Sequence, residues 1–264
     1  MLTFEHFNSA FASLHLGDKP AIAHASVRSF GVIQNGVEAL LGALLSSVNG
    51  LMMPAFTYKT MIIPEVGPPN NGLAYGKHRD LNRMAEPFHR EMLVDPLIGA
   101  LAEKLRTYPG AMRTAHPILS FAGVGVDGAL VTQTLYNPFT PIGWLADHDG
   151  WVLLLGVNHT VNTSIHYAEK LAGRRQFVRW GLTKKRILEC LGFPGCSDGF
   201  ETIRPDIEHV TRRVEIGNSF IEAIPIRPLL SAVEATLKEN PLALLCQRGE
   251  CERCDAIRAL PALR

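Results

Sequence analysis

Short apolar segments recur along the first two thirds of the chain, and stretches with a different periodicity separate them. Each apolar segment has the length and composition of a buried β-strand, whereas the stretches between them show the spacing of amphipathic helices. This alternation predicts an α/β fold with a mostly parallel central sheet flanked by helices. The expected strands are 21–27, 51–56, 118–124 and 151–157, and the expected helices are 36–48, 95–107 and 129–135.

The 264 residues fit a single α/β domain, 1–264, in which residues 175–264 form a mixed C-terminal extension. The periodic pattern weakens in this extension, where a helix over 229–238 is the clearest expectation. Residues 63–87 contain several prolines and glycines and show no periodicity. Because long irregular loops in compact domains usually have a function, we expect this segment to be a lid or a wall of a substrate site.

Composition and charge limit the kinds of partner. Hydrophobic residues make up 47% of the chain and charged residues 19%, as in globular proteins with a substantial core. The formal net charge of +1 favours neither nucleic acid nor an anionic membrane as a partner. The N-terminus does not resemble a secretory signal, and no apolar run approaches the ~18 residues that span a bilayer. We therefore expect a cytoplasmic protein with reduced thiols and a small-molecule substrate, and a homodimer is compatible with the sequence.

A histidine and a glutamate follow the last apolar strand. Asn162 or Thr163 can cap a helix that continues to about Lys170, and His166 and Glu169 are three positions apart on one face of that helix. A carboxylate beside an imidazole fixes its tautomer and supports its charged form, which is how a general base is built. Such a pair would lie beyond the carboxyl end of a central strand, where open α/β sheets bind ligands. From spacing alone, a surface ion pair with no chemistry is the more common explanation of such a pair.

Four segments together resemble the aminoglycoside 3-N-acetyltransferase family. They are 24–31 (HASVRSFG), 50–57 (GLMMPAFT), 113–121 (RTAHPILSF) and 150–169, which contains NTSIHYAE, and they occur in the order of the family. The resemblance spans roughly residues 20 to 175. It implies an enzyme that transfers an acetyl group from acetyl-coenzyme A (acetyl-CoA) to a substrate amine, with His166 and Glu169 as the catalytic residues. In that mechanism the amine attacks the thioester directly, and backbone amides or Ser26 stabilise the oxyanion.

The residues alone leave the role of the two coenzyme segments open. Residues 24–31 are either an ordinary strand-to-loop turn or a turn whose amides bind phosphate, and His116 is either a buried histidine or a wall of a pantetheine channel. The Ser120 hydroxyl can bond an amide of that group. The resemblance implies that coenzyme A contacts His24, Ser26, Arg28, Ser29, Phe30, Gly31, Arg113, Thr114, His116 and Ser120.

The sequence leaves the acceptor amine open. Family members often have an aspartate where this chain has Thr160, and a missing carboxylate weakens a site for a polycation such as an aminoglycoside. A family member that acetylates another amine is therefore an alternative. A hydrolase is a second one: since the motif Gly-x-Ser-x-Gly is absent, it would need Cys-His chemistry with Cys190 or Cys196.

Cysteines concentrate near the C-terminus, where Cys246, Cys251 and Cys254 lie within nine residues. With Cys196, which sits in a Pro-Gly-Cys-Ser turn, they can supply the four thiolates of a tetrahedral zinc site. Such a zinc would be structural and would take no part in acyl transfer. The alternative interpretations are three unlinked thiols that pack as small apolar residues, or a non-catalytic module that binds partners through a metal.

Overall fold

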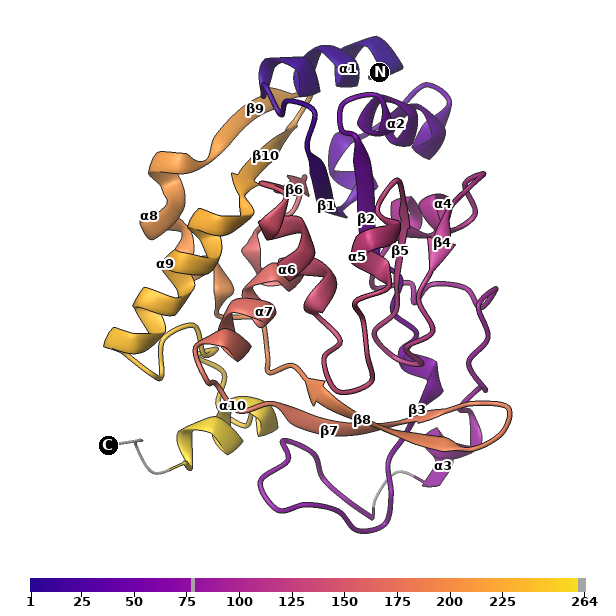
Figure 1. Ribbon diagram of the computed structural model, residues 1–264, viewed down its shortest axis with the longest axis vertical. Helices are drawn as coiled ribbons and strands as arrows, with labels where there is room; N and C mark the ends of the chain where they lie inside the picture. Colours follow the sequence, from indigo (N-terminus) through magenta and orange to yellow (C-terminus); the bar gives the residue numbers. More distant parts are fainter. Residues whose placement is uncertain (77–78, 261–264) are drawn as a thin grey trace.

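A seven-stranded sheet forms the centre of the computed structural model, which describes residues 1–76 and 79–260 (Figure 1). The strands follow the order β4-β5-β2-β1-β6-β10-β9 across the sheet. Their bounds are Pro20–Ala25 (β1), Gly50–Pro54 (β2), Met112–Arg113 (β4), Phe121–Val124 (β5), Trp151–Leu155 (β6), Arg212–Ile216 (β9) and Ser219–Pro225 (β10). A smaller sheet, β3-β7-β8, contains Met61–Ile62, Phe177–Leu182 and Ile187–Phe193.

The expected α/β class is confirmed, but parallel pairing is confined to the middle of the sheet. β1 pairs in parallel with β2 and with β6, whereas β5, β4, β10 and β9 all pair antiparallel with their neighbours. The expectation of a mostly parallel sheet is therefore corrected. Parallel neighbours need a long crossover, which the helix between β1 and β2 supplies, whereas the two-residue turn between β9 and β10 allows only an antiparallel pair.

Helices cover both faces of the central sheet. The helices of the described residues are α1 (Phe4–Ser13), α2 (Gly36–Leu45), α3 (Arg79–Arg83), α4 (Ala100–Arg106), α5 (Asp127–Leu130), α6 (Thr140–Asp147), α7 (Thr163–Leu171), α8 (Arg204–Ile207), α9 (Ile226–Glu239) and α10 (Glu252–Arg258). Of these, α3 and α10 lie away from the central sheet, near the smaller one (Figure 1). The helix expected over 95–107 begins only at Ala100, because Gly99 precedes it with a φ of +99°. The helix expected over 129–135 is a single turn that ends at Leu130, and the helix expected over 229–238 starts three residues earlier.

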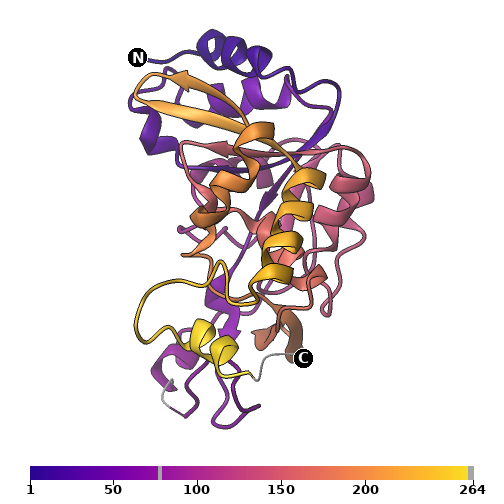
Figure 2. The same ribbon diagram turned by 90° about the vertical axis from the view of Figure 1, so that its left-hand side faces the viewer.

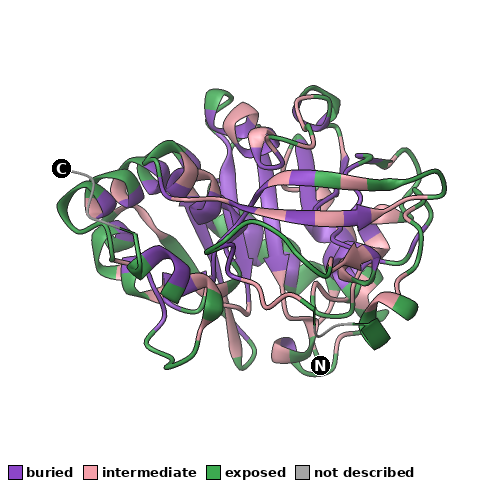
Figure 3. Cartoon of the chain, turned by 90° about the horizontal axis from the view of Figure 1, so that it is seen from below, coloured by how far each residue is buried: buried purple, intermediate pink, exposed green. Residues whose placement is uncertain are grey.

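Alternate residues of the strands feed two separate cores, one on each face of the sheet. In β1, Ala21 and Ala23 pack with α1, α2 and α4, whereas Ile22 between them packs with the core of α6, α7 and α9. β6 divides in the same way, with Leu153 in one core and Leu154 in the other. Because both faces are covered, these strands consist almost wholly of apolar residues. Figure 3 shows that the strands in the middle of the molecule are buried.

The C-terminal third is built into the main fold. β10 lies directly beside β6, and α9 packs on α7 (Figure 2). The hairpin β7–β8 and helix α10 lie together at the lower end in Figure 1, beside the irregular segment that precedes α3. Among the described residues, none of the helices combines the length and apolar character needed to cross a membrane.

Gly156 follows β6 and lies close to the turn after β1 (residues 24–31), which we call the first turn. Its φ is +64°, and a Cβ there would lie 1.8 Å from Ser29 Oγ and 2.9 Å from Ser29 Cβ. Gly173 has a similar φ of +78° but no neighbour within 4 Å of a Cβ, so it is a matched control. We expect Gly173→Ala to lower the free energy of unfolding by about 1 kcal/mol and Gly156→Ala by about 2 kcal/mol or more, measured by urea denaturation. Equal losses would show that the contact with Ser29 carries no energy.

Candidate active site

A cleft of about 1190 Å³ opens where the parallel strands β1, β2 and β6 end. Parallel strands present their carboxyl ends at the same edge of a sheet, and the chain there turns into loops that can line a site. The floor of the cleft includes His24 at the end of β1, Met53 at the end of β2 and the first turn of α7. Its walls come from segments far apart in the sequence, namely 94–100, 193–197 and 252–253.

The start of α7 is held by hydrogen bonds of its own side chains. Asn162 is the residue before the helix, and its side-chain oxygen accepts the Ser164 backbone N–H at 3.1 Å. Its amide group contacts Nδ1 of the buried His159 at 3.1 Å. Asn162, rather than Thr163, is thus the cap, and the helix directs His166 toward the cleft.

His166, Glu169 and Arg174 form a buried chain of contacts. His166 Nδ1 lies 2.8 Å from Glu169 Oε2, and Glu169 Oε1 lies 2.6 Å from Arg174 Nη1. Because a carboxylate only accepts hydrogen bonds, Nδ1 carries the proton that points at Glu169, and Nε2 is left with a free lone pair. The predicted contact between His166 and Glu169 is therefore present, and it is buried rather than on the surface.

Aromatic rings hold the imidazole in place. Phe139 stacks on the His166 ring with centroids 5.9 Å apart, and Phe200 meets it edge-on at 4.7 Å. Both phenylalanines are buried, so the ring has little room to turn. A histidine with a fixed tautomer, restricted rotation and access to a cleft can take a proton from a bound ligand.

Only some of the residues predicted to bind coenzyme A in the turn after β1 (24–31) line the cleft. His24, Ser26 and Arg28 line it, and Arg28 is exposed and has no ion pair within the described part of the chain. Ser29 instead donates its hydroxyl hydrogen to the Ser26 carbonyl at 2.7 Å, and Phe30 is buried against α1. Gly31 closes the turn with a φ of +71°.

Two buried histidines beside α7 are neutral. Burial lowers the pKa of His24 to about 3, and the nearby His159 lowers it further. The Thr163 backbone N–H donates to His24 Nε2 at 3.4 Å, which places the His24 proton on Nδ1. Burial also lowers the pKa of His159. Neither ring competes with His166 for a proton at neutral pH.

The segment 113–121 lies behind the cleft instead of lining it. The Arg113 guanidinium donates to the backbone carbonyls of Ala55, Arg90 and Met92, and its Nε contacts Ser120 Oγ at 3.1 Å. Ser120 also donates to the Ala55 carbonyl at 2.7 Å.

Thr114 and His116, the other two predicted coenzyme residues of this segment, also bond to the backbone around them. Thr114 Oγ1 accepts the Phe121 N–H, and His116 Nδ1 accepts the backbone N–H groups of Ile118 and Leu119. Burial lowers the pKa of His116 to about 4. For Arg113, Thr114, His116 and Ser120 the geometry therefore favours support of the β2 and β5 loops over direct contact with a coenzyme.

Charged groups of both signs face the cleft away from the first turn. Asp95 and Glu252 are carboxylates that form no salt bridge among the described residues. Burial raises the pKa of Tyr58 to about 12, and the negative charge of Asp95 raises it further while Arg253 lowers it. Asp95 and Arg253 thus both lie close enough to Tyr58 for their charges to act on its hydroxyl.

Four thiols meet beside the cleft. The Sγ atoms of Cys196, Cys246, Cys251 and Cys254 all lie within 4.8 Å of one another, and all but Cys251 are buried. The hydrogen bond from Cys254 lowers the pKa of the Cys196 thiol, and Arg248 contributes in the same direction. Cys190 lies apart in the core, where burial raises its pKa to about 12.

Several residues of the site have no motif in the sequence. Arg174 lies just after a glycine that ends α7, and a cation near a helix C-terminus was the only hint of its role. Phe139 and Phe200 look like ordinary core residues. Tyr58, Asp95 and Arg253 reach the cleft from three separate segments, so only the tertiary structure brings them together.

Residues 22–238 match the family described as aminoglycoside 3-N-acetyltransferase. The match covers most of the chain and includes the whole α7 site. The chain belongs to this family. Aminoglycoside N(3)-acetyltransferase IX of Micromonospora chalcea is 32% identical over 165 residues, which are 58% of this chain and 56% of that protein. Aminoglycoside N(3)-acetyltransferase IV of a Salmonella species is 29% identical over 88% of this chain and 87% of its own length. The first of these family relatives is thus matched over little more than half its length.

Solved structures of the aminoglycoside 3-N-acetyltransferase family share the fold. The apoenzyme of aminoglycoside acetyltransferase AAC(3)-IVa superposes with a TM-score of 0.78 at 23% identity, and 97% of each chain is covered. YokD of Bacillus subtilis gives 0.76 at 20% identity, with 91% of this chain and all of that chain covered. At these identities the likeness establishes the fold and leaves the reaction to be argued from the site.

Proposed function

We propose that the protein is an acetyl-CoA-dependent N-acetyltransferase whose general base is His166. The observation that carries the proposal is the chain of contacts from His166 through Glu169 to Arg174, with the imidazole at the edge of a large cleft. In a member of this family, a fixed imidazole that lines a cleft beside a buried carboxylate fits proton transfer from an amine. One related structure, AAC-IIIb, is a binary complex with coenzyme A, which supports the same co-substrate here.

Coenzyme A would bind through the first turn, against His24, Ser26 and Arg28. The coenzyme carries several phosphates, and the unpaired guanidinium of Arg28 is a suitable partner for one of them. The neutral His24 has Nδ1–H available as a donor, because its Nε2 accepts from Thr163. The cleft is at least as large as common ligand sites, so it has room for a thioester and an acceptor together.

The chemistry follows from the tautomer of His166. Nε2 accepts a proton from the acceptor amine as its nitrogen attacks the thioester carbonyl, and Glu169 stabilises the imidazolium that forms. The oxyanion of the tetrahedral intermediate is stabilised by donors at the end of β1, including Ser26. The carbon–sulfur bond then breaks, and the thiol of coenzyme A leaves as a thiolate that needs little acid assistance, because a thiol has a pKa near ~8.5.

The acceptor would be an amine held by the carboxylates Asp95 and Glu252. Two relatives of this fold are described as complexes with a gentamicin and with sisomicin, so aminoglycosides belong in any substrate screen. Thr160 lines the cleft and adds no negative charge, whereas Arg253 adds a positive one. This mixed charge favours an acceptor with fewer ammonium groups than an aminoglycoside.

A Cys-His hydrolase is less well supported. Burial raises the pKa of Cys190 to about 12, so this thiol is not a nucleophile at neutral pH. Cys196 belongs to the group of four thiols. The His166 imidazole is distant from it in the sequence and packs against Phe200 instead.

The coenzyme assignment is tested by thermal stability. Acetyl-CoA that binds only the native state should raise the melting temperature, whereas Arg28→Ala should reduce that shift without lowering the melting temperature of the free protein. Release of the coenzyme thiol is then followed with a panel of amines that includes sisomicin and simple monoamines. Absence of any thermal shift at millimolar acetyl-CoA would overturn the proposed function.

The catalytic pair is tested by a double-mutant cycle. His166→Ala should lower kcat by roughly two to four orders of magnitude, as removal of a general base does. Glu169→Gln should cost less, and the double variant should lose little more than His166→Ala, because Glu169 acts through the imidazole. The rise of kcat/KM with pH that depends on His166 should be absent in His166→Ala. Additive losses in the cycle, or an alanine variant with near-normal turnover, would contradict the assignment.

We also propose that Cys196, Cys246, Cys251 and Cys254 hold one structural zinc ion. Four sulfur atoms that are mutually within 4.8 Å match the ligand set of a closed tetrahedral site, which leaves no open position for catalysis. Elemental analysis of protein purified without added metal should find about one zinc per chain. Cys190→Ala should retain the metal and Cys251→Ser should lose it. Protein without zinc, in which all five thiols titrate freely in native buffer, would rule out the site.

A further inference from the structure

The thiol group and the cleft share the same short segments of chain. Gly195 and Ser197, which flank Cys196, both line the cleft. Glu252 and Arg253, which lie between Cys251 and Cys254, line it as well. Every thiol-bearing segment except that of Cys246 therefore contributes its immediate neighbours to the wall of the site.

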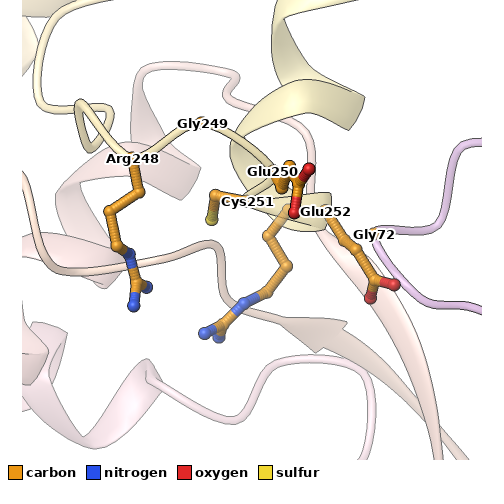
Figure 4. A pocket seen from close by; sticks show the side chains of 7 residues that line it. Gly72, Arg248, Gly249, Glu250, Cys251 and Glu252 are labelled. Atoms are coloured by element: carbon orange, nitrogen blue, oxygen red, sulfur yellow. The ribbon is translucent and has the colours of Figure 1, made fainter.

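Arginine side chains that bond to backbone carbonyls, together with one close backbone approach, connect these neighbours to the rest of the wall. Arg253 Nη1 donates to the Gly195 carbonyl at 2.9 Å and so joins the two thiol-bearing segments. Gly72, with a φ of +55°, packs so closely that a Cβ would lie 2.9 Å from the Arg253 Cα. Arg179 on β7 donates to the Gly72 carbonyl at 3.0 Å. Figure 4 shows Gly72 beside Glu252, the first residue of α10.

The part of the wall near the thiols has little regular secondary structure of its own. Helix α10 has only seven residues, too few to be stable without tertiary contacts. The chain from the end of α9 to Cys251 contains no helix or strand. Figure 4 shows Arg248 and Cys251 on this loop, with both side chains directed to the same side, where Arg248 approaches Cys196 Sγ at 3.8 Å. The four sulfur atoms lie within 4.8 Å of one another, so one metal ion bound by all of them would join this loop, α10 and the Cys196 turn.

We infer that zinc bound by Cys196, Cys246, Cys251 and Cys254 shapes the acceptor end of the cleft, so that metal loading controls amine binding but not coenzyme binding. The inference rests on the proposed function for its assignment of the two ends. The zinc-dependent wall carries Glu252, which lines the same cleft as Asp95, and neither carboxylate forms a salt bridge among the described residues, so both can bind an ammonium group. The first turn, with His24 and Arg28, belongs to the central sheet and is anchored by β6 and Thr163 rather than by the thiol segments.

Hydrogen exchange, with zinc alone as the probe, tests the structural part without any substrate. When a chelator removes the metal, the amides of 194–199, 71–73 and 248–258 should exchange at least about tenfold faster, and added zinc should restore them. Exchange of 24–31 should stay unchanged. Cys190→Ala, a cysteine outside the group, should behave as the native protein. Unchanged exchange of the wall after metal loss would overturn the inference.

Arg253→Ala tests the same wall with the zinc ligands intact, which covers the case in which metal removal unfolds the protein. The variant should keep its full zinc content, yet 194–197 and 71–73 should exchange faster because the contact with the Gly195 carbonyl is lost. Exchange identical to that of the native protein would overturn the inference.

Kinetics separate the two ends of the cleft. With the panel amine of highest turnover, Cys251→Ser and Arg253→Ala should raise KM for the amine about tenfold, whereas the Kd of coenzyme A should change by less than about twofold. Equal weakening of both ligands would overturn the assignment of the acceptor end. If the protein neither binds coenzyme A nor turns over any amine, the proposed function fails, while the zinc-dependent exchange of the wall remains a separate result.

Discussion

The site depends on the two contacts that the Glu169 carboxylate makes. One oxygen bonds the His166 imidazole and the other bonds Arg174, whose guanidinium also donates to the backbone carbonyls of Pro241 and Ala243. A buried carboxylate is tolerated only when it is paired, so the positions of His166, Glu169 and Arg174 depend on one another. Through Arg174 the same carboxylate ties α7 to the chain that leaves α9, and so links the imidazole to the C-terminal region.

The central sheet explains why this imidazole meets a cleft. Covered on both faces, β1 and β6 are apolar along their length, and polar residues begin only where the strands end. His24 and the loop before α7 therefore emerge at the same edge, beside each other, because β1 and β6 are parallel neighbours. The antiparallel strands at the borders extend the sheet without altering this edge. A mixed sheet thus places its ligand site as a fully parallel one does.

Charge distribution divides the cleft into two regions. Arg28 and the neutral His24 provide donors at the first turn, whereas Asp95, Glu252 and Arg253 line the cleft from two other segments. The buried guanidinium of Arg113 donates to three backbone carbonyls and so holds the loops behind the cleft. A family signature therefore identifies a fold reliably, but it does not say which of its residues touch a ligand.

The sequence by itself determined the alternation of strands and helices, the helix that carries His166 and Glu169, and the four cysteines that could meet, because each follows from local periodicity or composition. It did not determine that β10 would pair antiparallel with β6 and so bring the β9–β10 hairpin into the sheet, since this pairing joins segments far apart in the chain. Nor could it show that Arg174 completes the pair, or that Arg113 and Ser120 point away from the cleft. Spacing along the chain indicates which residues share a face of one helix or strand. Which of those faces lines the cleft depends on burial and on how distant segments pack.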